Sequence, residues 1–204
     1  MNPLNSIAGT IGAGVVLAIV LVLVTMGNHN VAPMAVNSVV IWLHVLAGIT
    51  WIGLLYYFNF VQVPALAQAA SDQGGPGGAG ITKYVAPRAL AWFRWGAVVT
   101  WLSGAAFLLH RGQLDDAFAL GMLTDPVAPY SLTIGMGAWL GTIMLFNVWV
   151  LIWPNQKKIL GLVEATPDEI AKGKRTAFLA SRTNTLLSVP MVMCMVGAGH
   201  GFFM

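Results

Sequence analysis

The chain has 204 residues, of which 57% are hydrophobic and only 8% charged, and its mean hydropathy is +0.76. Because soluble domains carry about 25% charged residues, this composition excludes a soluble globular surface and indicates one membrane domain over residues 1–204. The net charge of +3 does not indicate nucleic-acid binding, since the basic residues lie at the ends of apolar segments, where they orient a membrane protein.

Five apolar stretches are long enough to cross a bilayer, whose core of about 30 Å needs about 20 helical residues. They predict helices at residues 7–26, 36–61, 91–110, 130–153 and 185–204. The first lacks a preceding Lys or Arg and is longer than the core of a usual signal peptide, so we expect it to be retained. Residues 71–78 are expected to be a flexible linker, and residues 166–174 a short amphipathic helix. The predicted fold is an all-α polytopic bundle of about five transmembrane helices.

The basic residues are distributed unequally between the two sides of this topology. Of the ten Lys and Arg residues, only Arg111 lies on the side that holds the first and third connections. Short segments rich in Lys and Arg stay on the cytoplasmic side of a membrane. The sequence therefore predicts an inside N-terminus and an outside C-terminus.

All four histidines fall in the outer half of the predicted bundle. His29 lies in the first connection, where we expect it to be solvated, and His44 lies roughly 12 Å deep in the second helix at 1.5 Å per residue. His110 ends the third helix and His200 lies near the end of the fifth. Ionisable residues inside a bilayer are costly and mostly functional, and imidazole is a common ligand of heme iron. We predict a heme b ligated by His44, with His200 or His110 as the second axial ligand.

Other residues near these histidines suit a heme site. Gly48 lies one helical turn from His44 and leaves room for a flat ligand, and Arg111 at the outer rim is placed to pair with heme propionates. The only cysteine, Cys194, excludes a Cys-x-x-Cys-His attachment of a c-type heme. Glycines four residues apart, at 137 and 141 and at 197 and 201, have an alternative explanation, because this spacing also serves helix packing in membranes.

A second polar cluster is predicted on the inner side. Ser181, Asn184 and Ser188 recur at helical spacing around the start of the fifth helix, and Asn147 lies in the fourth. The sequence leaves the interpretation of this pattern open: the side chains line an inner-leaflet cavity or a proton path, or they form hydrogen bonds that hold helices together.

Three segments resemble the membrane domain of the bacterial membrane-bound urate oxidase family. They are WLHVLAGITWIGLLYY at residues 42–57, NVWVLIWPNQK at 147–157 and RTNTLLSVPM at 182–191. A more distant similarity is to the small heme-b membrane protoporphyrinogen oxidases. That similarity places His44 at the position of the family's heme-ligating histidine. Members of the urate oxidase family carry a longer membrane region and a cytochrome c domain, so we expect a separate electron acceptor for this chain.

The leading hypothesis is a heme-b electron-transfer protein of a bacterial inner (plasma) membrane. It would exchange electrons with a quinone or small reductant and with a basic, cytochrome c-like partner at the acidic outer connection, which contains Asp115, Asp116 and Asp125. Two alternatives stay open: a membrane oxidase acting on urate or a porphyrinogen, and a non-catalytic scaffold subunit of a larger respiratory or photosynthetic complex.

Overall fold

The computed structural model describes residues 2–29 and 36–201, without the side chains of residues 25–29. Within these ranges every regular element is a helix, which confirms the predicted all-α class. The chain divides into two compact units, residues 1–39 and 40–204, which we describe separately. The single domain expected over residues 1–204 stays a prediction.

The first unit contains a short 3-10 helix, η1 (Pro3–Asn5), and the apolar helix α1 (Ile7–His29). None of the side chains of α1 between residues 7 and 24 is buried within the protein. The helix predicted at 7–26 is confirmed and runs slightly further. His29 is therefore the last residue of a helix rather than part of a connection, and its side chain lies outside the described part of the structure.

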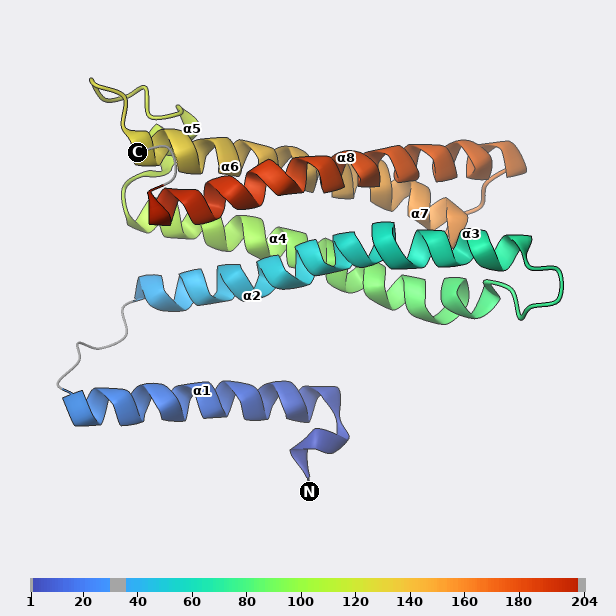
Figure 1. Cartoon of the computed structure of the whole chain (residues 1–204), viewed down its shortest axis with the longest axis horizontal. Helices are drawn as coiled ribbons and strands as arrows, with labels where there is room; N and C mark the ends of the chain where they lie inside the picture. Colours follow the sequence, from blue (N-terminus) through green and yellow to red (C-terminus); the bar gives the residue numbers. More distant parts are fainter. Residues whose placement is uncertain (1, 30–35, 202–204) are drawn as a thin grey trace. The chain divides into compact units, whose positions relative to one another are not determined.

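The second unit is built from long helices that lie side by side (Figure 1). In chain order its elements are α2 (Val36–Tyr56), η2 (Tyr57–Gln62), α3 (Val63–Ser71), η3 (Ile81–Val85), α4 (Ala86–His110), α5 (Leu114–Phe118), α6 (Pro129–Phe146), η4 (Asn147–Ile152), α7 (Trp153–Ile159) and α8 (Pro167–His200). The segments η2, η3 and η4 are π-helical. Because η2 and η4 continue the helices around them, residues 36–71 and 129–159 each form one long helix.

The prediction of a separate amphipathic helix at residues 166–174 is wrong. These residues form the first turns of α8, which continues without a break to His200. Thr166 and Glu169 form a capping box at its start, and Pro167 occupies the first turn, where its missing N–H costs nothing. Gly201 ends the helix with a φ of 75°, and residues 202–204 of the predicted helix lie outside the described residues.

Three helices in the described part of the chain are long and apolar enough to cross a membrane: Ile7–Val24, Val36–Ser71 and Pro129–Ile159. This supports a helical membrane protein. Helices α4 and α8 overlap the other two predicted spans, at 91–110 and 185–204. The count of five spans and the inside position of the N-terminus stay predictions.

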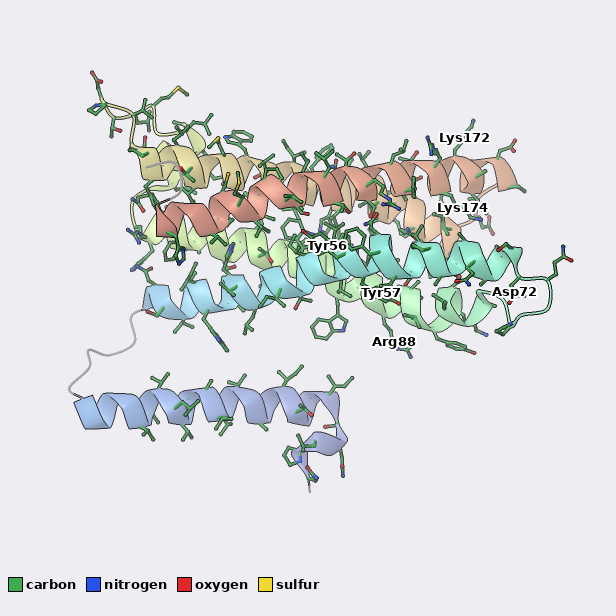
Figure 2. The ribbon with its side chains drawn as sticks, in the orientation of Figure 1. Tyr56, Tyr57, Asp72, Arg88, Lys172 and Lys174 are labelled. Carbon is green, nitrogen blue, oxygen red and sulfur yellow. The ribbon has the colours of Figure 1, made fainter. Side chains whose placement is uncertain are left out.

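The hydrophobic core of the second unit does not extend evenly from one end of the bundle to the other. The starts of α2 and α6 and the ends of α4 and α8 meet at one end, which we call the cavity end (Figure 1). The opposite end, which we call the basic end, includes Arg88, Lys172 and Lys174 (Figure 2). The hydrophobic core lies between the middle of the bundle and the basic end; it contains Trp51, Leu55, Phe58, Leu90, Phe93, Ala97, Met144, Val148, Ile152, Ala180 and Met191.

Candidate functional site

A cavity of about 500 Å³ occupies the half of the second unit that the core leaves unfilled. Its walls come from α2, α4, α6 and α8, and Phe118 of α5 contributes near the cavity end. Most of the lining is apolar; the polar or charged exceptions other than the Trp indoles are His44, Thr100, Arg111, Tyr130 and His200. A volume of this size and a mostly apolar wall with few polar groups are typical of small-molecule and cofactor sites.

Glycines help to make this space. Gly141 of α6 lies on the cavity wall, and a Cβ atom there would meet nothing within 4 Å. Gly137, one turn away, has the packing role that its spacing also predicted, because a Cβ there would lie 3.1 Å from Cys194 Cβ on α8. Gly137 therefore lets α6 and α8 pack closely, and Gly141 widens the cavity.

His44 is held by α4 from across the helix interface. Its Nδ1 lies 2.8 Å from the backbone carbonyl of Thr100, and Ser103 Oγ is 3.4 Å from the same nitrogen. A carbonyl oxygen only accepts hydrogen bonds, so Nδ1 carries the proton and Nε2 of the neutral ring keeps a free lone pair. A Cβ at Gly104 would lie 2.9 Å from His44 Cε1, so the absence of a side chain there lets the ring rest against α4.

His200 has the same kind of hydrogen bond at the end of α8. Its Nδ1 lies 2.9 Å from the carbonyl of Val196, which likewise leaves Nε2 without a proton in the neutral ring. The side chain is exposed, whereas that of His44 is half-buried. Both rings line the cavity and both keep one nitrogen available as an electron-pair donor.

The register of α2 against α8 places these two histidines at a similar depth. The helices run antiparallel, and Tyr56 Oη lies 3.0 Å from Ser188 Oγ. Twelve residues separate Tyr56 from His44, and twelve separate Ser188 from His200, so both histidines lie about 18 Å along their helices from this bond.

His110 and Gly48 are not brought into the cavity wall. His110 is the exposed last residue of α4, ten residues or roughly 15 Å beyond Thr100, the residue that holds His44. Gly48 instead faces α4, where a Cβ would lie 3.8 Å from Thr100 Cγ2. The structure thus groups His44 with His200, and neither His110 nor Gly48 lines the cavity.

Arg111 lies at the cavity end and lines the cavity. Its guanidinium carbon is 5.6 Å from the ring centres of both Phe107 and Tyr130. None of the described carboxylates lies within ion-pair distance of it, so its charge is available to an anionic group.

Two residues that line the cavity, Thr100 and Tyr130, were not predicted from the sequence. A signal for Thr100 exists, because Gly96, Thr100, Ser103 and Gly104 form a ridge of small residues at helical spacing. In the structure this ridge faces α2, where Gly96 lies against the backbone of Trp51 and Gly104 against His44. No comparable pattern marks Tyr130.

Among the described side chains, no group of three or more His, Cys, Asp or Glu residues lies close enough together to hold a metal ion. Among the described residues, the histidines that line the cavity are His44 and His200. Two imidazoles suit a metal that already carries its own equatorial ligands, as heme iron does.

Comparison with known families gives one match. The family model described as urate oxidase N-terminal matches residues 31–111 and 117–204. No curated protein and no solved structure matches the chain. The matched ranges include α2, α4, α6, α8 and every residue that lines the cavity. They extend the resemblance seen at residues 42–57, 147–157 and 182–191 to most of the sequence. The chain belongs to the urate oxidase N-terminal family.

Proposed function

We propose that the protein is a heme-b electron-transfer protein of the bacterial plasma membrane, with the heme in the cavity between α2 and α8. The observation that carries the proposal is the pair His44 and His200. They line one cavity at a similar depth, and each is hydrogen-bonded through Nδ1 so that Nε2 remains free. A ligating histidine usually donates its other ring N–H to a carbonyl or carboxylate in this way.

The remaining residues of the cavity fit the same cofactor. The apolar wall suits a porphyrin face, and Arg111, which has no carboxylate partner among the described residues, suits the propionates. A bound heme would supply one-electron chemistry by cycling its iron between two oxidation states. The protein's own contribution is to hold the two imidazoles in one tautomer, exclude water with the apolar wall and neutralise the acidic edge of the cofactor.

The electron partners in this proposal are a quinone or small reductant and a cytochrome c-like protein. The segment beside the cavity end carries Asp115 and Asp125, both exposed, and Asp116, whose Oδ1 accepts a hydrogen bond from Leu123 N at 3.1 Å. An acidic surface near the cofactor favours a basic redox partner and makes its association sensitive to salt. In the proposed orientation this end faces the periplasm.

A reduced-minus-oxidised absorption spectrum tests the proposal. The purified protein should show a b-type α band after reduction with dithionite, in a heme-to-protein ratio near one. Protein that was expressed with ample heme, is folded by circular dichroism and still shows no such band would contradict it.

Oxidation of urate is a second candidate, favoured by membership of the urate oxidase N-terminal family. Urate is a flat anion, and Arg111 is the cation at the cavity. Under this alternative, urate added without oxygen should reduce the b-type band, and Arg111→Gln should slow that reduction. An unchanged spectrum at saturating urate would contradict urate oxidation and would agree with electron transfer from another donor.

A further inference from the structure

A row of buried and half-buried polar side chains leads from the floor of the cavity toward the basic end, along the interface of α2 and η2 with α8. Tyr56 Oη and Ser188 Oγ are 3.0 Å apart, and because the Ser188 hydroxyl donates to the carbonyl of Thr185 at 2.7 Å, Tyr56 is the donor between them. One turn further along η2, Asn59 Nδ2 donates to Ser181 Oγ at 2.8 Å. Tyr56 and Asn59, one member of each pair, lie in the helical region of 36–71 that is apolar enough to cross a membrane, where unpaired polar groups are very costly.

The two ends of the row carry polar atoms without a partner. At the cavity end of the row, Trp51 lines the cavity, is 2% exposed, and its indole N–H has no hydrogen bond in the described structure. At the other end Gln62 is 8% exposed, and its Oε1 also lacks a partner there. Buried polar atoms of this kind are usually satisfied by ordered water. One end thus offers a donor and the other an acceptor for water.

The backbone changes from α-helical to π-helical partway along the row. The π-helical segment η2 starts at Tyr57, directly after Tyr56, and contains both Asn59 and Gln62. Short π-helical segments inside α-helices occur frequently at functional sites, because the wider turn moves side chains out of the regular helical register. Here the wider turn includes two of the polar residues of the row.

A neighbouring polar pair has a different role. Asn184, fully buried on α8, donates to the carbonyl of Met144 at 3.0 Å and accepts from Asn147 Nδ2 at 2.8 Å. These bonds use its donor and its acceptor within the protein and join α8 to α6 and η4. Among the polar side chains of α8, Asn184 therefore serves packing, whereas Ser181 and Ser188 belong to the row.

We propose that this row conducts protons between the cavity and the basic end, with water completing it at Trp51 and Gln62. At the centre of the row, the Tyr56 hydroxyl passes its proton to Ser188 Oγ while it accepts another from the water at Trp51. Ser188 in turn releases its own proton, which it donates to the Thr185 carbonyl at rest, to a water molecule beside Asn59. Each transfer forms one O–H bond and breaks one, so no oxidant or reductant is needed. The amides of Asn59 and Gln62 position water and do not themselves change protonation. The inference goes beyond electron transfer and does not depend on a heme.

Proton flux into liposomes tests the proposal directly. The full-length protein is reconstituted with a pH-sensitive dye trapped inside, and a potassium diffusion potential set with valinomycin drives protons inward. Wild-type protein should conduct protons faster than protein-free liposomes. Tyr56→Phe should slow the flux by about tenfold, less than the ~10²–10⁴-fold that a positioned proton-transfer group contributes, because water retains some transfer.

The adjacent tyrosine provides a matched control. Tyr57 is half-buried, and its hydroxyl has no hydrogen bond in the described structure, so Tyr57→Phe should conduct like wild type (Figure 2). If Tyr56→Phe does not yield folded protein, Ser188→Ala takes its place, and Ser131→Ala removes a similarly buried hydroxyl outside the row as its control. Wild-type flux equal to that of empty liposomes, or equal flux in the row variant and its control, would overturn the proposal. A heme-free protein that still conducts would leave it standing.

Discussion

The imidazole of His44 on α2 donates through Nδ1 to the backbone carbonyl of Thr100 on α4, over 2.8 Å. This bond has two consequences. It fixes the orientation of the ring against the cavity wall, and it leaves Nε2 as the only nitrogen able to bind a metal. Because the acceptor is a backbone carbonyl, a substitution of the Thr100 side chain does not remove the bond.

The first prediction separates the histidines by their place in the structure. His44→Ala and His200→Ala should each lose the b-type absorption band or shift it, since each removes one nitrogen donor from the cavity. His110→Ala is the matched control, because His110 is a helix-terminal histidine outside the cavity wall. Heme content per protein by the pyridine hemochrome method is the measurement. Loss of heme in His110→Ala with retention in His200→Ala would reverse the assignment of the second ligand.

The second prediction concerns the space beside His44. A Cβ at Gly104 would lie 2.9 Å from Cε1 and 3.0 Å from Nδ1 of that ring, so Gly104→Val should push the ring out of its hydrogen bond. We expect a loss of about 1–3 kcal/mol in the free energy of unfolding, which is typical of overpacking, together with reduced heme content. Gly53→Val is the control, because a Cβ there meets nothing within 4 Å. Equal heme content in the two variants would show that the ring does not need this space.

The sequence marked His44 by its place in an apolar helix, but it did not show which other histidine lines the same cavity. A histidine eight residues into an apolar helix is marked by position alone, because burial of an ionisable group in a bilayer is costly. Grouping His44 with His200 requires the register of α2 against α8, to which the contact between Tyr56 and Ser188 contributes. That contact joins residues far apart in the chain, and no local pattern encodes it.

The positions of the helices could likewise be predicted where the local sequence determines them, but not where they depend on tertiary contacts. Long apolar runs predicted the positions of α1, α2 and α6 because about 20 such residues are what a bilayer requires. The start of α8 was also encoded locally, by Thr166 and Glu169 of its capping box, but the polar character of the following residues favoured a connection. The π-helical turns at Tyr57 and Asn147 were not predictable, since they coincide with hydrogen bonds to α8 that only the tertiary structure creates.

The third prediction tests the packing role of Asn184. Asn184→Ala removes its bonds to Asn147 and Met144 and leaves the Asn147 amide buried without this partner. The expected loss is about 1–3 kcal/mol in the free energy of unfolding, the usual cost of an unsatisfied buried polar group. Thermal unfolding in detergent, followed by circular dichroism, measures it, and exposed Thr183→Ala is the control.

A double-mutant cycle distinguishes this pair from two independent side chains. Asn147→Ala combined with Asn184→Ala should cost less than the two single variants added together, by about 0.5–3 kcal/mol, because the second substitution removes a group that has already lost its partner. Strict additivity would contradict a direct bond between the two amides.

The last prediction concerns pH and the start of α8. The Glu169 carboxylate accepts hydrogen bonds from the backbone N–H of Thr166 at 2.9 Å and from its hydroxyl at 3.2 Å, and Lys158 Nζ lies 3.5 Å away. These contacts lower the pKa of the Glu169 carboxyl below its usual 4.5. The backbone hydrogen bond has the largest effect, followed by the hydroxyl bond and the charge of Lys158. A group whose pKa is lower in the folded state stabilises the fold above its unfolded pKa and loses that contribution as the pH falls through the folded pKa.

Glu169→Gln isolates the charge, because glutamine still supports a capping box but carries no charge for the helix dipole or Lys158. Wild type should therefore melt at a higher temperature than Glu169→Gln at pH 7. The two melting temperatures should converge as the pH falls from 4.5 through the lowered pKa of the folded state, below which the wild-type carboxyl is neutral. Glu164→Gln removes an exposed carboxylate that forms no ion pair in the described residues, so its melting temperature should stay close to that of wild type at both pH values. A gap between wild type and Glu169→Gln that persists unchanged at pH 3 would assign the effect to the shape of the side chain rather than to its charge.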